Sequence, residues 1–272
     1  MPRFEPHPER RPAVVTGASS GIGRASAIAL AAAGHPLAIG GRRGDRLAQT
    51  AAEIEAAGGE AHAFHLDLAD PPSVDAFAKS ARDAVGDVDI VVCAAGRSVP
   101  DSAVEPSPDE FAATVAVNLT GTHRLVASFV PSMVARRRGD VVVVTSEVVR
   151  FPRVRTSAYV ASKWGLEGYA RTLQMELEST GVRVSIVQPG QTLTEMGSDW
   201  DPEATTEVLQ EWIRWGVARH HHFLDPAAVA RAVRTVVEMP PGTHLSMVEV
   251  QPVAPVARGG EGRSPRPGEG ER

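Results

Sequence analysis

Short apolar runs alternate with longer segments of helical period through most of this 272-residue chain. Such alternation is typical of repeated βαβ units, in which crossover helices join parallel strands. The apolar runs predict strands at 12–16, 35–39, 60–66, 88–93, 139–145, 183–188 and 244–250. Helices are expected at 21–33, 45–57, 73–85, 108–137, 157–180 and 226–238. The chain therefore belongs to the α/β class, with a doubly wound parallel sheet of about seven strands flanked by helices.

One segment, 191–224, interrupts the alternation and contains a short helical pattern at 203–215. Long loops at the carboxyl end of a strand are usually functional. After Pro252 the chain is rich in Gly, Pro, Arg, Glu and Ser, which bury too little apolar surface to offset the entropy of ordering. We expect a single catalytic domain over 1–258 and a disordered tail over 259–272.

Composition excludes several classes of protein. With 28 basic and 33 acidic residues, the net charge of -5 gives no electrostatic basis for binding nucleic acid or an anionic membrane. No apolar stretch approaches the roughly 20 residues of a membrane span, and the charged start of the chain does not resemble a secretory signal. The lone cysteine, Cys93, excludes an intrachain disulfide and fits a reducing cytoplasm. No metal site is expected at His220–His222, because consecutive side chains point in different directions.

A glycine-rich loop follows the first expected strand and opens into a helix. It reads Thr16-Gly17-Ala18-Ser19-Ser20-Gly21-Ile22-Gly23. Gly17 permits a tight turn, Gly21 allows a pyrophosphate to approach the backbone, and Gly23 lets the helix pack on the sheet. The free N–H groups at the helix start then face the phosphates. We expect Ser19, Ser20 and Ile22 to contact a bound dinucleotide along with these glycines.

The end of the second strand indicates which nicotinamide cofactor is preferred. An acid at this place accepts the ribose 2′-hydroxyl of NAD, whereas arginines accommodate the 2′-phosphate of NADP. Here the chain reads Gly40-Gly41-Arg42-Arg43, with no acid. Two guanidinium groups can pair with a phosphate in bidentate geometry. NADP is therefore favoured, with NAD as a second option, although the arginines would also suit an ordinary solvated turn.

Tyr159 and Lys163 are four residues apart in an expected helix and so share one face. A tyrosine with a pKa of about 10 is a poor base near neutrality, but a neighbouring ammonium and an oxidised nicotinamide favour its phenolate. Ser146 ends an apolar strand, at the edge where α/β sheets bind ligands. Its hydroxyl suits stabilisation of charge on a reacting oxygen, or alternatively satisfies backbone groups at the strand end.

These motifs together resemble the short-chain dehydrogenase/reductase family over about 13–250, which implies a Rossmann-like fold and hydride transfer between NAD(P) and a carbonyl/alcohol pair. The resemblance implies a catalytic tetrad of Asn118, Ser146, Tyr159 and Lys163. Tyr159 and Lys163 would also contact the cofactor. The further cofactor contacts that it implies are Asp67, Leu68, Ala94, Ala95, Gly96, Pro189, Gly190, Thr192 and Thr194.

The chain departs from the family at two places. Cys93-Ala94-Ala95-Gly96 replaces the usual NNAG, which puts side-chain hydrogen bonds that steady the sheet in doubt. Cys93 is expected to be a buried small hydrophobic residue rather than a reactive thiol. Glu147 follows Ser146 where a small apolar residue is common, and it faces either a polar substrate group or solvent.

In this family the segment 191–224 forms a substrate lid. Trp200, Trp212 and Trp215 lie in it, which suggests a hydrophobic or ring-containing substrate. The same side chains would equally suit packing of the lid onto the body or onto another subunit.

The leading hypothesis is an NADP-dependent oxidoreductase for a small carbonyl or secondary alcohol. The alternatives are a catalytically idle NADP-binding regulator, an extended-branch epimerase or dehydratase, and a ketoacyl reductase for carrier-linked substrates. Resemblance of the helices 108–137 and 157–180 to family interfaces predicts a homodimer or homotetramer.

Overall fold

The structure is a computed structural model that describes residues 6–104, 106–198, 200–217 and 222–256. The tail expected at 259–272 and two of the three consecutive histidines, His220 and His221, lie outside the described residues. No helix in the described ranges has both the length and the hydropathy that a membrane span needs.

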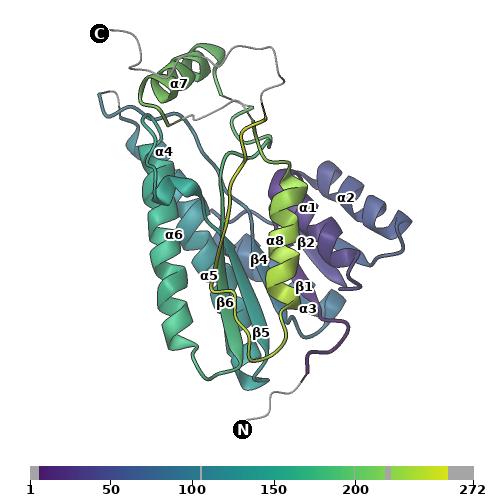
Figure 1. The fold of residues 1–272 in the computed structure, drawn as a ribbon. Helices are drawn as coiled ribbons and strands as arrows, with labels where there is room; N and C mark the ends of the chain where they lie inside the picture. The colour runs from purple at the N-terminus through teal and green to yellow at the C-terminus, as the bar shows by residue number, and fades with distance from the viewer. Residues whose placement is uncertain (1–5, 105, 199, 218–221, 257–272) are drawn as a thin grey trace.

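In the described part of the chain seven strands form one parallel sheet, as the alternating pattern predicts, in the order β3-β2-β1-β4-β5-β6-β7 (Figure 1). In chain order they are β1 (Ala13–Thr16), β2 (Leu37–Gly41), β3 (Ala61–His65), β4 (Ile90–Cys93), β5 (Gly139–Val144), β6 (Val182–Pro189) and β7 (Met247–Val250). The order reverses direction after β1, and its neighbour on the other side is β4. This switch point is where open α/β sheets bind ligands, outside the carboxyl ends of the strands.

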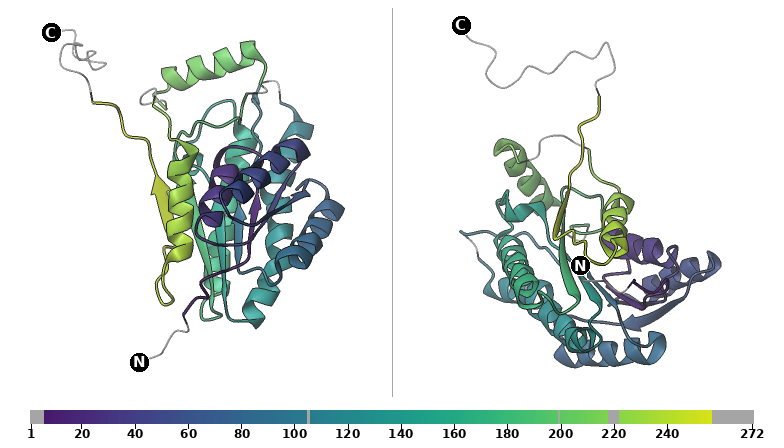
Figure 2. Two further views of the ribbon diagram at one scale, coloured as in Figure 1. Left: turned by 90° about the vertical axis from the view of Figure 1, so that its right-hand side faces the viewer. Right: turned by 60° about the horizontal axis from the view of Figure 1, so that its bottom comes forward.

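Helices cover both faces of the sheet (Figure 1, Figure 2). One face packs against α1 (Gly21–Ala31), α2 (Gly44–Ala56) and α8 (Pro226–Glu238). The other packs against α3 (Pro71–Val85), α5 (Thr122–Ala135) and α6 (Ser157–Glu176). Because helices cover both faces, the central strands β1, β4 and β5 are buried throughout, which explains their continuous apolar runs.

The single helix expected over 108–137 is interrupted. It divides into α4 (Pro108–Val115), a π-helical turn η1 (Ala116–Gly121) and α5. Pro131 lies inside α5 without ending it. Gly121 packs so closely on the backbone of Leu68 that an added Cβ would lie 2.0 Å from the Leu68 carbonyl oxygen. Tertiary contact therefore accompanies this local widening of the helix, and π-turns of this kind are frequent at functional sites.

The last strand is shorter than the expected run 244–250. Side chains bind backbone carbonyl groups of the residues just before it. Arg183 donates to the Thr243 carbonyl at 2.7 Å, and Gln174 donates to the Ser246 carbonyl at 2.8 Å. The regular strand begins at Met247.

The described parts of the segment 191–224 lie beyond the carboxyl ends of the strands and include α7 (Pro202–Arg214), at the top of Figure 1. Asp201 caps α7 by accepting from the backbone N–H groups of Glu203 and Ala204, both at 3.0 Å. Backbone hydrogen bonds between Leu224 and the start of the segment hold its two ends together, Leu193 N to Leu224 O at 2.9 Å and Leu224 N to Gln191 O at 2.8 Å. The expected helix at 203–215 is present within one residue at each end.

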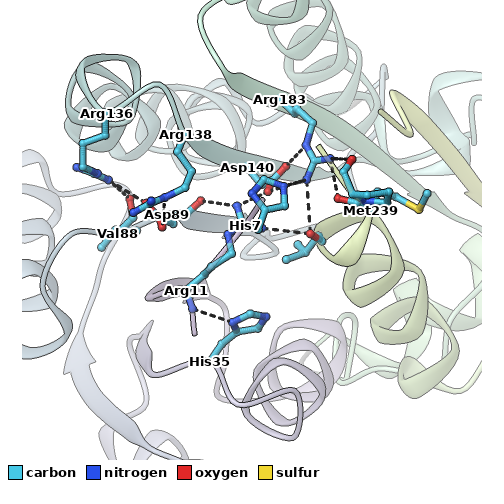
Figure 3. Close-up of polar contacts among 12 residues, drawn as sticks. His7, Arg11, His35, Val88, Asp89, Arg136, Arg138, Asp140, Arg183 and Met239 are labelled. Atoms are coloured by element: carbon cyan, nitrogen blue, oxygen red, sulfur yellow. Dashed lines mark hydrogen bonds and ion pairs between the residues drawn. The ribbon is translucent and has the colours of Figure 1, made fainter. Parts of the chain in front are cut away.

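At the opposite edge of the sheet lies a cluster of charged side chains that the sequence pattern did not predict (Figure 3). We call it the amino-edge charge cluster, and its members are His7, Arg11, Asp89, Arg136, Arg138, Asp140 and Arg183. Asp140 accepts from Arg11 and, at 2.7 Å, from Arg183. Asp89 pairs with Arg138 at 2.7 Å. Arg11 and Asp140 are each only 2% exposed, so charge pairing here takes place in the protein interior.

Candidate active site

The glycine-rich loop joins β1 to α1 at the switch point of the sheet. Gly17 has a φ of +69°, and a Cβ there would lie 2.8 Å from the Cα of Ala95, which follows β4. A Cβ on Gly23 would lie 2.3 Å from the carbonyl oxygen of Gly17. Both positions thus require glycine, the first for its turn and close approach and the second for helix packing. The loop has the form that the sequence spacing predicts.

The hydroxyl of Thr16 holds the segment after β4 in place. Its Oγ1 accepts hydrogen bonds from the backbone N–H groups of Ala94 and Ala95, both at 3.2 Å. It donates to the carbonyl of Val92 at 3.4 Å. Thr16 therefore steadies β1 against β4 even though the two asparagines usual in this place are absent. Cys93 is buried, and burial raises the pKa of its thiol to about 12, which matches an unreactive core residue.

Asn118 lies in the π-helical turn and is fully buried. Its Oδ1 accepts from the Arg97 backbone N–H at 2.8 Å, while its Nδ2 donates to the Arg97 carbonyl and to Ser162 Oγ, both at 2.9 Å. An asparagine is unfavourable inside a helix unless tertiary contacts compensate it. These three bonds are that compensation, and they tie η1 to both α6 and the segment after β4.

Tyr159 and Lys163 lie on α6, and the ammonium nitrogen of Lys163 is 5.8 Å from the centre of the Tyr159 ring. Lys163 Nζ donates to the Val144 carbonyl at 2.9 Å. Gly96 lies beside them, since an added Cβ would be 3.4 Å from Asn118 Oδ1 and 3.7 Å from Lys163 Nζ. The structure therefore brings Asn118, Tyr159 and Lys163 together at the carboxyl edge of the sheet.

Burial dominates the electrostatics of this group. It lowers the pKa of Lys163 to about 8, because the charged ammonium is desolvated. It raises the pKa of Tyr159, an effect that interaction with the Ser146 side chain and the positive charge of Arg153 partly oppose. Burial of Tyr159 therefore favours the neutral phenol over the phenolate.

Ser146 lies two residues after the end of β5 and directly precedes the short 3-10 helix η2 (Glu147–Val149). Its Oγ accepts from the Val148 backbone N–H at 3.3 Å, which is the capping role that the sequence left open as an alternative. The same side chain also acts on the pKa of Tyr159. Ser146 consequently combines a backbone cap with a place beside the Tyr159 hydroxyl.

The two arginines after β2 differ in their contacts. Arg43 donates to Ser20 Oγ at 2.7 Å and to Ser19 Oγ at 3.0 Å, so it lies against the glycine-rich loop. It also pairs with Glu195 at 2.6 Å. Arg42 is exposed and makes no hydrogen bond or ion pair within the described part of the chain. Cationic groups therefore flank the glycine-rich loop, in the place where the sequence predicts contact with a phosphate.

Asp67 and Leu68 follow β3. Asp67 Oδ1 accepts from the Ala69 backbone N–H at 2.9 Å and its own N–H donates to Ser73 Oγ at 2.9 Å, which matches the capping role of a lone aspartate at a strand end. Leu68 is buried. The geometry leaves contact with an adenine ring as a prediction.

The segment after β6 contacts the glycine-rich loop through Thr194. Thr192 Oγ1 donates to the Gly190 carbonyl at 2.9 Å, and Gly190 N donates to the Val250 carbonyl at 2.8 Å. An added Cβ on Gly21 would lie 3.1 Å from the methyl group of Thr194. Thr194 is therefore close to the glycine-rich loop, and contact of residues 189–194 with a cofactor stays a prediction.

Glu147 does not face solvent. It is buried and pairs with Arg153, whose guanidinium lies 4.7 Å from the centre of the Trp212 ring on α7. Trp212 Nε1 donates to the Val154 carbonyl at 3.0 Å, and Trp200 Nε1 donates to the Ser98 carbonyl at 2.8 Å. Two of the three tryptophans in the segment 191–224 thus pack it onto the body, which was the alternative to a substrate-binding role. The third, Trp215, is exposed.

Four side chains have structural contacts that no sequence motif predicted, and these are Thr16, Ser162, Glu195 and Arg153. Thr16 begins the glycine-rich loop, and Ser162 lies between Tyr159 and Lys163 in the sequence. Their position within these motifs was the signal that could have identified them. Glu195 and Arg43 are 152 positions apart, and no local pattern joins them. No three His, Cys, Asp or Glu side chains gather as a metal would require within the ranges that the structure describes.

Comparison with known proteins gives the same family as the motifs. A family model described as short chain dehydrogenase matches residues 11–205. A glycine betaine reductase of Emericella nidulans is 36% identical over 239 residues, which are 88% of this chain but only 18% of that protein. A 2,3-dihydro-2,3-dihydroxybenzoate dehydrogenase of Bacillus subtilis is 32% identical over 244 residues, 88% of this chain and 93% of that protein.

Solved structures agree. A metagenomic short-chain oxidoreductase in complex with NADP is 31% identical, with a TM-score of 0.75 over 90% of this chain and 98% of its own. Structures of this fold hold NADP in some cases and NAD in others. The chain is thus a member of the short-chain dehydrogenase/reductase family, an NAD(P)-dependent oxidoreductase that acts on CH–OH groups.

Proposed function

We propose that this protein is an NADP-preferring oxidoreductase that interconverts a ketone and a secondary alcohol, with Asn118, Ser146, Tyr159 and Lys163 as its catalytic tetrad. The observation that carries the proposal is the gathering of these four side chains beside the glycine-rich loop, at the carboxyl edge of the sheet. Reactive groups and a phosphate-binding loop on one edge suit hydride transfer from a bound dinucleotide.

The residues present fit a dinucleotide. Gly17 and Gly23 allow the close packing that shapes the loop, and Gly21 begins α1, whose first backbone N–H groups suit a pyrophosphate. Gly96 leaves room next to Lys163, whose ammonium can donate to ribose hydroxyls. The other residues that would hold the cofactor are Ser19, Ser20, Ile22, Arg42, Arg43, Asp67, Leu68, Ala94, Ala95, Pro189, Gly190, Thr192 and Thr194. When bound, the nicotinamide supplies or accepts the hydride.

Preference for NADP is supported by charge. The end of β2 carries Arg42 and Arg43 and no acid, and Arg43 already donates to the two serines of the glycine-rich loop. A phosphate bound between the loop and these arginines would gain charge-assisted hydrogen bonds. The 2′-hydroxyl of NAD offers no such partner for a guanidinium.

The proton step belongs to Tyr159. Its raised pKa makes it a neutral phenol that can donate its proton to a carbonyl oxygen during reduction. Ser146 beside it would hydrogen-bond the same oxygen and stabilise charge that develops there. The Lys163 ammonium stabilises the phenolate that remains, and Asn118 fixes α6 through its bond to Ser162. In the direction of oxidation the phenolate takes the proton back.

The substrate is inferred from this chain's own site, since the names of the two relatives denote chemically unlike compounds. Glu147 and Arg153 neutralise each other beside Tyr159, so they offer no net charge to a substrate. The exposed side chains Leu193 and Met196 add apolar surface to the segment 191–224, which we take as a substrate lid. We therefore propose an uncharged, largely hydrophobic substrate.

Exposed apolar side chains also support a homo-oligomer. Phe111 on α4 and Trp164 on α6 are exposed, and these helices lie in the regions that the family resemblance implicates in dimer or tetramer formation. Light scattering at increasing protein concentration tests this assignment. We place the protein in the cytoplasm because its single cysteine allows no intrachain disulfide.

The proposal is tested by NADPH oxidation with uncharged ring ketones, beside Tyr159→Phe and Tyr169→Phe variants. The chain has only these two tyrosines, and both are on α6, so Tyr169→Phe is a matched control. Loss of the phenol should lower kcat/KM by about a hundredfold or more while NADPH binding is kept. A Tyr159→Phe variant as active as the wild type would contradict the assigned mechanism. NADPH binding without turnover of any carbonyl would favour the idle regulator.

A further inference from the structure

A carboxylate from the lid occupies the arginines beside the glycine-rich loop. Glu195 Oε2 lies 2.6 Å from Arg43 Nη1, and Glu195 Oε1 lies 3.7 Å from Arg46 Nη1. The hydrogen bond from Arg43 holds the pKa of Glu195 below its ordinary value, so this side chain is an anion at neutral pH. One acid thus bridges two cations that follow β2.

The surroundings of Glu195 join three parts of the chain. Arg43 extends from the end of β2 and contacts both serines of the glycine-rich loop. Thr194, the neighbour of Glu195, packs on Gly21 in the same loop. Met196, on the other side, lies 3.7 Å from the place where a Cβ of Gly96 would be. Residues 194–196 therefore extend from the glycine-rich loop to the segment after β4.

The ion pair between Glu195 and Arg43 affects the binding of a phosphate to the same arginine. A guanidinium pairs with a phosphate through the same N–H groups that it uses for a carboxylate. A phosphate that binds Arg43 must therefore displace Glu195 or accept the repulsion of a nearby negative charge. A 2′-hydroxyl meets no such opposition.

We propose that Glu195 is a specificity-determining residue that competes with the 2′-phosphate of the cofactor for Arg43 and Arg46. This inference rests on the proposed NADP site. Glu195 weakens the binding of a 2′-phosphorylated nucleotide and leaves the binding of its unphosphorylated counterpart nearly unchanged. Binding of the phosphate frees Glu195 from the arginines, which links cofactor identity to the position of the lid.

The test compares Glu195→Gln with Glu203→Gln, which changes the net charge equally in the same segment. Glu203 is exposed in the first turn of α7 and forms no ion pair in the described residues. The ligands are 2′,5′-ADP and 5′-AMP, which differ only in the 2′-phosphate, followed by NADPH and NADH. Because exposed ion pairs are weak, we expect 2′,5′-ADP and NADPH to bind Glu195→Gln about fivefold more tightly, with 5′-AMP and NADH within about twofold.

The outcomes separate this inference from the proposed function. A wild-type protein that binds neither NADPH nor 2′,5′-ADP removes the NADP site itself. If the wild type binds both but Glu195→Gln leaves their affinities unchanged or weakens them, the NADP site stands and competition by Glu195 is wrong. An equal gain in Glu203→Gln would assign the effect to net charge and would also overturn it.

Discussion

Replacing Lys163 by methionine should stabilise the fold while it removes function. Burial lowers the pKa of Lys163 from 10.5 to about 8, and one pKa unit corresponds to ~1.4 kcal/mol, so the buried ammonium costs the folded state about 3 kcal/mol near neutrality. Methionine removes that cost but also the hydrogen bond to the Val144 carbonyl, worth about 1 kcal/mol. The net gain is about 2 kcal/mol.

For a domain of this size, such a gain should raise Tm by about 4 °C. The control is Lys79→Met, because the chain has only these two lysines and Lys79 is exposed in a pair with Asp83. Exposed pairs four residues apart on a helix contribute about 0.5 kcal/mol or less, so Lys79→Met should be nearly neutral. NADPH affinity should fall in Lys163→Met alone.

The pH dependence of the free energy of unfolding tests independently whether the Lys163 ammonium destabilises the folded state. The folded-state pKa of Lys163 lies below its unfolded value, so between about 8 and 10.5 the unfolded state binds a proton that the folded state has released. Wild-type stability should therefore rise with pH across this window relative to Lys163→Met, and the advantage of the variant should vanish at the upper end. A Lys163→Met variant that is less stable than the wild type at neutral pH would refute the reasoning.

Two further predictions concern the amino-edge charge cluster (Figure 3). Asp140→Asn should lower the free energy of unfolding, measured in urea, by about 3–5 kcal/mol, since it leaves the buried Arg11 without its carboxylate partner. The control Glu53→Gln loses an exposed pair with Arg24 and should cost less than about 1 kcal/mol. Equal losses in the two variants would contradict this account. Burial, and after it the charge of Arg11, lowers the pKa of His7 from 6.5 to about 4. As the pH drops through that window the unfolded state gains a proton first, so the stability of the fold falls. His7→Gln should therefore remove part of the loss of stability in acid. Urea midpoints at about pH 5 and pH 7 measure the effect, with the exposed His65→Gln as the variant that should behave like the wild type.

Much of the fold follows from local patterns. The valine run of β5 is buried on both faces of the sheet. After β1, Gly23 packs on the carbonyl of Gly17, and Gly17 packs on Ala95 next to the adjacent strand β4, so both contacts are short-range or between neighbouring strands. These features repeat the geometry of a βαβ unit, so a single sequence contains enough information to predict them.

The remaining features depend on residues that are distant in the chain. Helical period continues through 116–121, and only contact with Leu68 and the bonds of Asn118 distinguish the π-helical turn there. Arg11 precedes a strand in the sequence like any solvated cation, but its carboxylate partner is 129 positions away. The tryptophans Trp200 and Trp212 suggested a hydrophobic pocket, whereas their indole N–H groups bind body carbonyls. Such pairings require the tertiary structure.

The measurement that tests the central claim most directly is titration of the wild-type protein with NADPH and with NADH, followed by nicotinamide fluorescence. The account predicts binding of both, with the Kd of NADPH about tenfold lower or more, and loss of that difference when Arg42 and Arg43 are both replaced by alanine. Equal affinities, or tighter binding of NADH, would contradict the NADP assignment. Failure to bind either would contradict the account as a whole.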